Sequence, residues 1–530
     1  MANSTQPIKL IHLIFGSSAF ALLLLLTLGT VLVLWLNADI KTTLSSSDWS
    51  IIRFTVSQAI VSATISVLIA IPTARALFFR NFKGRKFILT IMGAPFILPT
   101  IVAILGIIAV WGRSGYISEF ISNFNINPLN IYGFTGVVLA HVFFNIPLAT
   151  RFIVQGWAAI PIEHFRLSAQ LGINTSGISQ HIERPMLKSV IPGIFLIIFL
   201  LCISSFAVAL ALGGGPKATT IELAIYQSLR FDFNFAKAAQ LGIIQFSLCA
   251  ILGIMTVLFS KPVQFSSGLD IKIERWDRTH FRYLLFDIFI LTFVCLFLFL
   301  PLLSIFIRGI IPIFSLPNTV WIAAFNSVLV AIVSSIISIG MAISMSGLIV
   351  RVSHKFPITS QAIEIVSFLT LAASPFIIGT GLFILIFPYI SPFTIALPIT
   401  ALVNAAMALP FALRMILPAM ARAEKNYGKL ADSLGMTKFS RFRIAIWPRL
   451  RRPVGFSAGL AAALSMGDLG VITLFAPADV ATLPLIMYRL MSSYQISAAS
   501  GVALLLVSLS ILLFWVFDRG GQIEHNIRQY

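Results

Sequence analysis

Charged residues are scarce in this sequence. Only 10% of its 530 residues are Asp, Glu, Lys or Arg, and 58% are hydrophobic, whereas ordinary soluble domains carry about 25% charged residues. Residues 10–38 contain no Asp, Glu, Lys or Arg, and such a stretch is long enough to cross a bilayer. It is too long for a signal-peptide core, and no small-x-small cleavage site follows it. This composition excludes a soluble fold and indicates a membrane protein that keeps its first helix.

Groups of residues that carry out chemistry are also missing. The three cysteines, Cys202, Cys249 and Cys295, lie in apolar runs and are interpreted as small core residues rather than metal ligands or disulfides. The seven histidines form no HExxH-type pair. Gly428 and Lys429 are a Gly-Lys pair, but they lack the surrounding spacing of a phosphate-binding loop. We therefore expect no catalytic residue, no metal and no cofactor, and any ATP hydrolysis would belong to a separate partner.

Long apolar runs divide the chain into twelve predicted transmembrane helices. All of them need to be helical, because lipid offers backbone groups no hydrogen-bond partner. The predicted spans are residues 10–37, 54–79, 88–111, 131–156, 190–212, 236–259, 284–307, 320–350, 363–388, 394–419, 455–476 and 499–517. The sequence thus predicts an all-α polytopic membrane protein.

The basic residues predict the orientation. The net charge is +19, with 37 Lys and Arg against 18 Asp and Glu. If the N-terminus is cytoplasmic, most basic residues fall on the cytoplasmic face, including a dense group between residues 414 and 452. The positive-inside rule favours this orientation over its opposite. The positive charge therefore reflects membrane topology rather than a nucleic-acid surface.

The two halves of the chain resemble each other. At an offset of 263 residues, IPLATRFI (146–153) aligns with LPFALRMI (409–416), which indicates a tandem duplication with six helices per half. An even number of helices makes the halves parallel rather than inverted. The predicted division is an N-terminal helix and periplasmic loop (1–53), a first transmembrane domain (54–259), a cytoplasmic connector (260–283), an extra helix and loop (284–319), a second transmembrane domain (320–517) and a cytoplasmic tail (518–530).

Each half of the chain carries one polar insert after its fourth predicted helix. The first, EHFRLSAQLGINTSGISQHIERP, contains Gly172 and Pro185, and the second, KNYGKLADSLGMTKFSRFRIAIWP, contains Gly435 and Pro448. Glycine supplies backbone freedom at a bend, and proline stops a helix before the next span. We expect two bent fingers, which suit a pair of identical soluble subunits. Two ordinary amphipathic loops on the lipid surface are the alternative.

These inserts resemble the EAA loops of type I ABC importer permeases. That pattern is E-A-A-x-x-x-G, followed ten and thirteen residues after the glycine by an aliphatic residue and a proline. The first copy reads RLSAQLG with Ile182 and Pro185, and the second reads KLADSLG with Ala445 and Pro448; both depart from the pattern at the glutamate and the first alanine. The resemblance implies two ATPase-coupling loops, while the charged residues also fit a merely solvated surface. The implied coupling residues are Arg166, Leu167, Gln170, Gly172, Pro185, Lys429, Leu430, Asp432, Gly435 and Pro448.

Three further segments are similar to the permeases of bacterial thiamine importers. They are LGGGPKATTIELAIYQSL (212–229), GDLGVITLF (467–475) and TLPLIMYRLM (482–491). The resemblance implies a permease subunit of the bacterial inner membrane that imports thiamine, or also its phosphates. Its implied partners are two copies of an ABC ATPase subunit and a periplasmic substrate-binding protein. The alternatives are a ferric-iron importer permease and an ion-coupled secondary transporter, although the latter needs no paired finger.

Few acidic residues fall within the predicted spans. Asp468 lies deep in the predicted eleventh helix, about 20 Å from its cytoplasmic start at 1.5 Å per residue. Asp287 lies near the start of the seventh helix and is expected to reach the membrane interface. Because intramembrane acids mark functional sites by default and thiamine is a cation, we predict that Asp468 faces the substrate path. A hydrogen-bonded structural aspartate is the alternative.

Overall fold

The structure is helical throughout its described residues. The computed structural model describes residues 10–38, 44–80, 82–92, 98–125, 130–213, 215, 218–259, 281–353, 355–370, 373–477 and 480–522. Among these residues there are helices and connections but no β-strand. The predicted all-α fold is therefore confirmed. Most of the predicted connector (260–283) and the end of the predicted tail lie outside the described residues.

Ten helices in the described part of the chain are long and apolar enough to cross a membrane. The predicted ninth and eleventh spans are not among them. The ninth is divided into α16 (Pro357–Leu369) and α17 (Pro375–Ile386), which are both short. The eleventh, α20 (Trp447–Met466), carries three arginines near its start and ends at a break. The chain is thus a multi-pass membrane protein, and the number of twelve spans stays a prediction.

Two series of helices follow each other in the same order, and α20 begins and ends 263 positions after α10. This is the offset of the sequence repeat. The domain bounds drawn from that repeat stay a prediction. The first series is α3 (Ser46–Phe79), α4 (Arg85–Ile91), α5 (Thr100–Trp111), α6 (Tyr116–Ser122), α7 (Phe134–Ala158), α8 (Ile162–Gln170), α9 (Thr175–Ile178), η3 (Ser179–Glu183), α10 (Arg184–Ile203), α11 (Phe206–Leu212), α12 (Ile221–Arg230) and α13 (Phe235–Phe259). The second series is α15 (Asn318–Ser353), α16, α17, η7 (Pro392–Ile395), α18 (Ala396–Ser433), α19 (Lys438–Ser440), η8 (Arg441–Ile446), α20, α21 (Gly470–Phe475), α22 (Leu483–Ser492) and α23 (Ile496–Gln522).

One residue explains a difference between the series. In the first series the helix is interrupted before Pro161, and α8 begins directly after it. Proline lacks the N–H of the helical hydrogen bond, and its ring clashes with the preceding turn. The corresponding position of the second series, 263 residues on, is Glu424, which α18 passes through without a break. The second insert is therefore carried on a continuous helix and the first on a separate one.

The helices that precede each series are exchanged between them. Helix α1 (Leu10–Leu24) packs on α15 of the second series, and α14 (Phe281–Gly309) packs on α3 and α5 of the first; α14 also packs on α23 of the second series, where Gly309 lies close to Ser500. Glycines allow the close approach: a Cβ added at Gly16 would lie 2.7 Å from Leu348 Cβ, and one at Gly106 would lie 2.6 Å from Pro301 O. We call the first series with α14 the first arm, and the second series with α1 the second arm.

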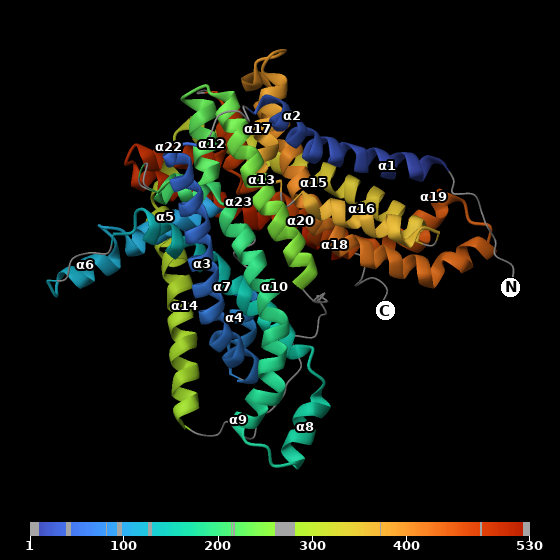
Figure 1. Ribbon diagram of the computed structural model, residues 1–530, viewed down its shortest axis with the longest axis horizontal. Coiled ribbons are helices and arrows are strands. Elements are labelled where there is room, and N and C mark those ends of the chain that lie inside the picture. The colour runs from blue at the N-terminus through green and yellow to red at the C-terminus, as the bar shows by residue number, and fades with distance from the viewer. Residues whose placement is uncertain are drawn as a thin grey trace.

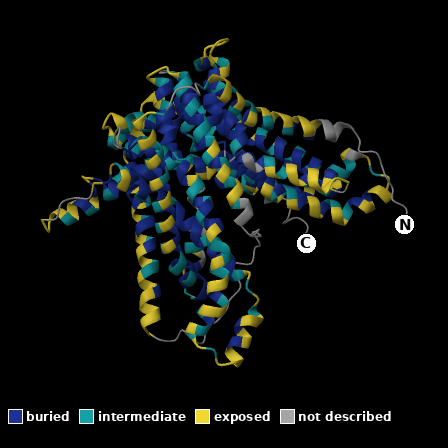
Figure 2. Cartoon of the chain, in the orientation of Figure 1, coloured by how far each residue is buried: buried dark blue, intermediate teal, exposed yellow. Residues whose placement is uncertain are grey.

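The two arms meet at one end and diverge toward the other (Figure 1). The first arm runs down to α8 and α9, and the second arm runs to the right, to α19. We call the end where the arms meet the apex. Exposed residues follow much of the outer surface of α14 and α1, while buried residues fill the region where the helices converge (Figure 2). The exposed residues of α14 are mostly large and apolar, as expected for a surface that faces lipid.

A buried ion pair holds α14 to the first arm. The Nε of Arg80, just after α3, donates to Oδ2 of Asp287 at 2.8 Å, and the Asp287 residue is only 2% exposed. Asp287 was expected to reach the membrane interface, but the structure buries it against α3. The Asp287 carboxylate therefore joins α14 to the first series of helices.

Removing one partner of this pair should destabilise the protein. We expect Asp287→Leu to lower the free energy of unfolding by about 2–3 kcal/mol, which is less than the roughly 3–5 kcal/mol of a fully buried pair because the Arg80 side chain is 25% exposed. Thermal unfolding in detergent measures this loss. Arg80→Leu combined with Asp287→Leu should recover most of it, and the exposed control Glu119→Gln should unfold like the wild type. If the double variant were no more stable than Asp287→Leu, the loss would not come from an unpaired Arg80.

Candidate coupling turns and the apex

The two polar inserts form the same turn. After α8, the N–H of Gly172 donates to Ala169 O at 3.1 Å, and that of Ile173 donates to Ser168 O at 3.0 Å. At the end of α18, Gly435 and Met436 make the equivalent bonds at 3.1 and 3.0 Å. This pattern is a Schellman motif, in which the residue after the helix takes a left-handed conformation. Gly172 and Gly435 do so, with φ of 63° and 59°.

The prolines of the inserts do not end a helix, contrary to expectation. Pro185 and Pro448 lie at the beginning of α10 and α20, and these helices continue directly from the π-helical segments η3 and η8. The N–H of Arg184 donates to Ser179 O, and that of Trp447 donates to Phe442 O, each five residues back. A π turn of this kind spaces the backbone more widely, which accommodates a residue without an N–H.

Both turns present apolar side chains to solvent. Leu167 and Leu171 are 55% and 66% exposed, and their counterparts Leu430 and Leu434 are 55% and 62% exposed. Each pair has the i, i+4 spacing that places two side chains on one helix face. The predicted coupling residues Arg166, Gln170, Lys429 and Asp432 are exposed beside them, as are Gly172, Gly435, Pro185 and Pro448. We call these two surfaces the coupling turns.

Asp432 differs from the other predicted coupling residues because it is already paired. Its Oδ1 accepts from Nη1 of Arg441 at 2.7 Å, and Arg441 also pairs with Glu424. This arrangement ties the end of α18 to η8. The corresponding positions of the first series are Ala169, Ile178 and Pro161, which cannot form it. There, Arg75 of α3 instead holds Glu183 of η3 at 3.0 Å.

The coupling turns are not brought together by the fold. Each lies at the far end of its own arm, with α8 and α9 at the bottom of Figure 1 and α19 at its right. Each turn is joined rigidly to the start of a long helix, α10 or α20, through a π-helical segment. Each turn is therefore connected along the chain to one long helix of its own arm.

At the apex, aromatic side chains join the two arms. Phe206 of α11 lies against Phe376 of α17, with ring centroids 4.4 Å apart. Tyr226 of α12 completes the cluster, 5.5 Å from Phe206 and 6.3 Å from Phe376. Beside it, Nη2 of Arg230 donates to the carbonyl of Ala476 in the second series at 3.2 Å. The apex is thus closed by direct contact between the arms.

Asp468 lies in a helix break at the apex rather than inside a helix. The break separates α20 from α21, and the Asp468 Oδ1 accepts the N–H of Gly470 at 3.1 Å. Its Oδ2 is buried without a hydrogen-bond partner among the described residues. A Cβ added at the preceding Gly467 would lie 3.1 Å from Pro99 Cα of the first arm, and one at Gly470 would lie 3.5 Å from the Phe376 ring. Asp468 is therefore placed where the two arms touch.

Sequence reasoning missed a second acid at the apex. Glu222, in the first turn of α12, is only 1% exposed, and its Oε1 has no hydrogen-bond partner among the described residues. It lies beside Ser374, the N-cap of α17. The sequence predicts no helix between residues 212 and 236, and Glu222 therefore does not stand out as an intramembrane acid. The available signal was Thr220, an N-cap residue that recurs as Thr482 before α22.

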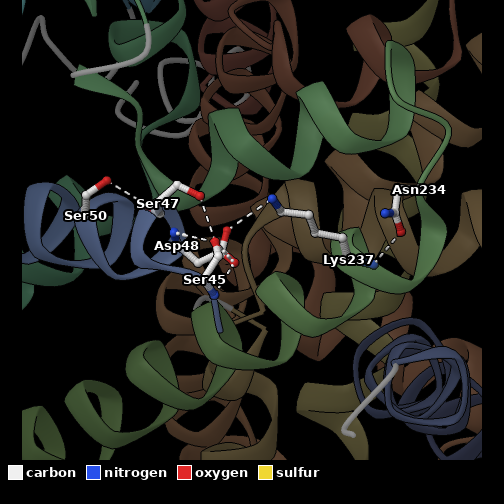
Figure 3. Close-up of polar contacts among 6 residues, drawn as sticks. All are labelled: Ser45, Ser47, Asp48, Ser50, Asn234 and Lys237. Atoms are coloured by element: carbon white, nitrogen blue, oxygen red, sulfur yellow. Dashed lines mark hydrogen bonds and ion pairs between the residues drawn. The ribbon is translucent and has the colours of Figure 1, made fainter. Parts of the chain in front are cut away.

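The apex side of the first arm is also locked by a capping network (Figure 3). Ser45 and Asp48 form a capping box at the start of α3, in which each side chain accepts the other's backbone N–H. Nζ of Lys237 lies 3.2 Å from Oδ1 of Asp48, and the backbone N–H of Lys237 donates to Oδ1 of Asn234. This network fastens the start of α13 to the start of α3.

Comparison with known proteins identifies the family. No family model matches the chain. The thiamine transport system permease protein ThiP of Brucella abortus is 35% identical over 528 residues, covering 97% of this chain and 95% of that protein. ThiP of Escherichia coli is 35% identical over 538 residues, covering 98% of each chain. ThiP of Haemophilus influenzae is 33% identical over 474 residues, covering 88% of this chain and 87% of that protein. The chain belongs to this family of thiamine transport system permeases.

A more distant match has a narrower extent. The probable transport system permease protein NifC of Clostridium pasteurianum is 28% identical over 183 residues, which cover 34% of this permease and 63% of NifC. The ThiP matches extend over both series of helices. The all-α polytopic architecture of the permease and its membership of the ABC permease class therefore agree with the prediction from its sequence.

The coupling turns should depend on their glycines. A residue with a side chain in the left-handed region costs roughly 1–2 kcal/mol, so Gly172→Val and Gly435→Val should each raise the population of an opened turn about tenfold. Limited trypsin cleavage at Arg166 or Lys429 measures this opening. Gly253→Val is the matched control, because Gly253 also has open space around its Cβ position but lies inside α13. Gly172→Asn should be milder, since Asn tolerates this region. Unchanged cleavage in both Val variants would contradict the requirement for glycine at these left-handed positions.

Proposed function

We propose that this protein is the membrane-spanning subunit of an ATP-driven importer that carries thiamine into the cytoplasm. The identity to thiamine transport permeases over nearly the full chain supports the substrate. The two matching coupling turns support the use of a paired ATPase. Neither a ferric-iron importer nor an ion-coupled transporter is favoured, because the full-length relatives are thiamine permeases. Thiamine uptake by vesicles that contain the permease, a cognate ATPase and a cognate binding protein tests the proposal. Uptake without ATP, or none with ATP, would contradict it.

The shape of the molecule fits an inward-facing state. With the N-terminus in the cytoplasm of a bacterium, the coupling turns lie on the cytoplasmic side of the inner membrane and the apex lies on the periplasmic side. The arms touch at the apex and diverge toward the coupling turns (Figure 1). A periplasmic binding protein would deliver thiamine at the apex. Bringing the coupling turns together would rock the arms as rigid bodies and separate the apex contacts.

Two copies of an ATPase subunit would supply this movement. The coupling turns have the same backbone hydrogen bonds and the same exposed leucine pair, so each can enter the same groove on an identical partner. The leucines would fill the buried centre of each contact, and Arg166 and Lys429 would lie at its rim. Apolar anchors at the centre carry more of the binding energy than charges at the rim.

Variants of the coupling turns should release the ATPase. Leu167→Asp with Leu430→Asp should reduce its co-purification strongly, because a charge would be buried in each contact. Arg166→Glu with Lys429→Glu should reduce it more weakly, since rim charges are partly screened. Arg53→Glu with Arg113→Glu is the control, because both residues are exposed and lie toward the apex. Normal retention of the ATPase by the leucine variant would contradict the assignment of these turns.

Thiamine is a cation, and its passage through the membrane requires compensation of that charge. A cation about 4 Å from a carboxylate gains roughly 4 kcal/mol at an effective dielectric of about 20, before the cost of desolvation. Asp468 and Glu222 each have a buried carboxylate oxygen without a hydrogen-bond partner in the described structure. Glu222 precedes Tyr226 by four residues in α12, and a Cβ at Gly470, two residues after Asp468, would lie 3.5 Å from the Phe376 ring; the rings of this aromatic cluster can also attract a cation. We infer that the substrate passes between these two acids when the apex opens.

Neutralising these acids should slow transport. Asp468→Asn and Glu222→Gln should each lower thiamine uptake severalfold or more while the ATPase remains bound and basal ATP hydrolysis persists. Asp468→Glu keeps the charge and should retain more activity than Asp468→Asn. The exposed Glu119→Gln is the control, since Asp287 is committed to Arg80 and cannot serve as one. If Asp468→Asn transports normally, or fails only because the complex no longer assembles, Asp468 is structural.

A further inference from the structure

A polar pocket lies in the first arm, between the second part of the first polar insert and the helices α3 and α14. It has a volume of about 220 Å³ and is lined by Arg75, Thr175, Ser176, Ser179, Gln180, Arg184 and Tyr283. Arg75 is one turn from the end of α3, Tyr283 is in the first turn of α14, and the others belong to α9, η3 and α10. The pocket therefore lies at the membrane boundary on the side of the coupling turns.

The charge of this pocket is positive. Nη2 of Arg75 is held 3.0 Å from Glu183 Oε2, and its Nε is buried without a hydrogen-bond partner in the described structure. Arg184 is exposed and makes no ion pair with any described residue. The two charged residues that line the pocket are thus both arginines, and the hydroxyl and amide groups beside them can donate hydrogen bonds to an anion.

The fold does not require polar residues at these positions. The second series has the same helix, π turn and helix, yet it places Phe439, Phe442 and Trp447 where the first has Ser176, Ser179 and Arg184. Phe442 and Trp447 pack together, with ring centroids 5.9 Å apart. Apolar rings are therefore compatible with this backbone, and the polar set in the first series needs another explanation.

The neighbouring surface indicates what kind of anion would bind. The pocket is bordered by the start of α14, where Phe286, three residues after the lining residue Tyr283, and Phe293 farther along the same side are 53% and 44% exposed. An apolar strip of this kind faces lipid chains, while the arginines and hydroxyls suit a phosphate group. Basic pockets between transmembrane helices on the cytoplasmic side are suited to anionic phospholipid headgroups. A soluble phosphate would use the pocket but not the apolar strip.

We propose that the pocket formed by Arg75, Arg184 and the hydroxyls of α9 and η3 binds the phosphate of an anionic phospholipid from the cytoplasmic leaflet, with its chains along α14. The lipid would join α10, which continues from the first coupling turn through α9 and η3, to α3 and α14. In the second arm, Phe439, Phe442 and Trp447 replace three of the lining residues, so the lipid would act on the first arm.

Native mass spectrometry of the full-length permease tests this proposal. Titration with phosphatidylglycerol should add one tightly bound lipid per wild-type chain, and phosphatidylcholine should not match it. Arg184→Gln should weaken this binding about fivefold or more. Ser179→Phe, which introduces the residue of the second series, should weaken it by filling the pocket. Arg443→Gln is the matched control, because Arg443 is exposed at the position of the second series that corresponds to Gln180, and it should bind like the wild type.

A second measurement separates a lipid from a soluble anion. Phosphatidylglycerol should raise the unfolding temperature of the wild type and not that of Arg184→Gln, while inorganic phosphate alone should leave both unchanged. If inorganic phosphate raised the unfolding temperature as much as phosphatidylglycerol does, the ligand would be a soluble anion, and the proposal would be overturned. Equal binding of phosphatidylcholine, or undiminished phosphatidylglycerol binding by both pocket variants, would also overturn it.

Discussion

Inside a bilayer, every backbone N–H and C=O needs a partner from the protein, because lipid provides none. Each interrupted helix therefore has to be completed by side chains or by another segment. At the end of α10, Nε2 of Gln58 donates to Cys202 O at 3.0 Å, and Nε2 of Gln245 donates to Ile203 O at 3.1 Å. Thr55 in turn accepts the first N–H of α12 at 3.0 Å, as Ser327 does for α22 at 2.8 Å. Scattered polar residues in apolar helices thus make the apex possible.

The two arms share a backbone plan but differ in how each is stiffened. Arg441 links two acids across the second coupling turn, whereas the first turn follows a helix interrupted before Pro161 and is held through Arg75 and Glu183. Because the two halves of this chain have different sequences, each can hold its coupling turn with different residues. Identical ATPase subunits would meet two similar surfaces on supports of unequal stiffness. Such asymmetry is not available to a permease assembled from two identical chains.

The sequence predicted long regular features well and short irregular ones poorly. Apolar runs located the long helices, and the 263-residue offset matched α10 to α20. The sequence did not predict the interruptions between α10 and α11 and between α20 and α21. Ser204, Ser205 and Gly467 lie in stretches that remain apolar on both sides, so composition alone indicates one continuous helix. Helix α12 was missed because it is short, and its buried Glu222 lowers its apparent hydrophobicity. Pro185 and Pro448 were misinterpreted as helix ends, since a π turn that accommodates proline leaves no mark in composition.

The exchange of α1 and α14 between the arms has a consequence for biosynthesis. Helix α1 enters the membrane first, yet its packing partner α15 begins only at Asn318. At about 5–20 residues per second, α1 remains without that partner for on the order of tens of seconds. The first arm likewise stays incomplete until α14 is made. During this interval the nascent chain exposes helix surfaces that are buried between the arms in the folded protein, and these surfaces face lipid and other membrane proteins instead.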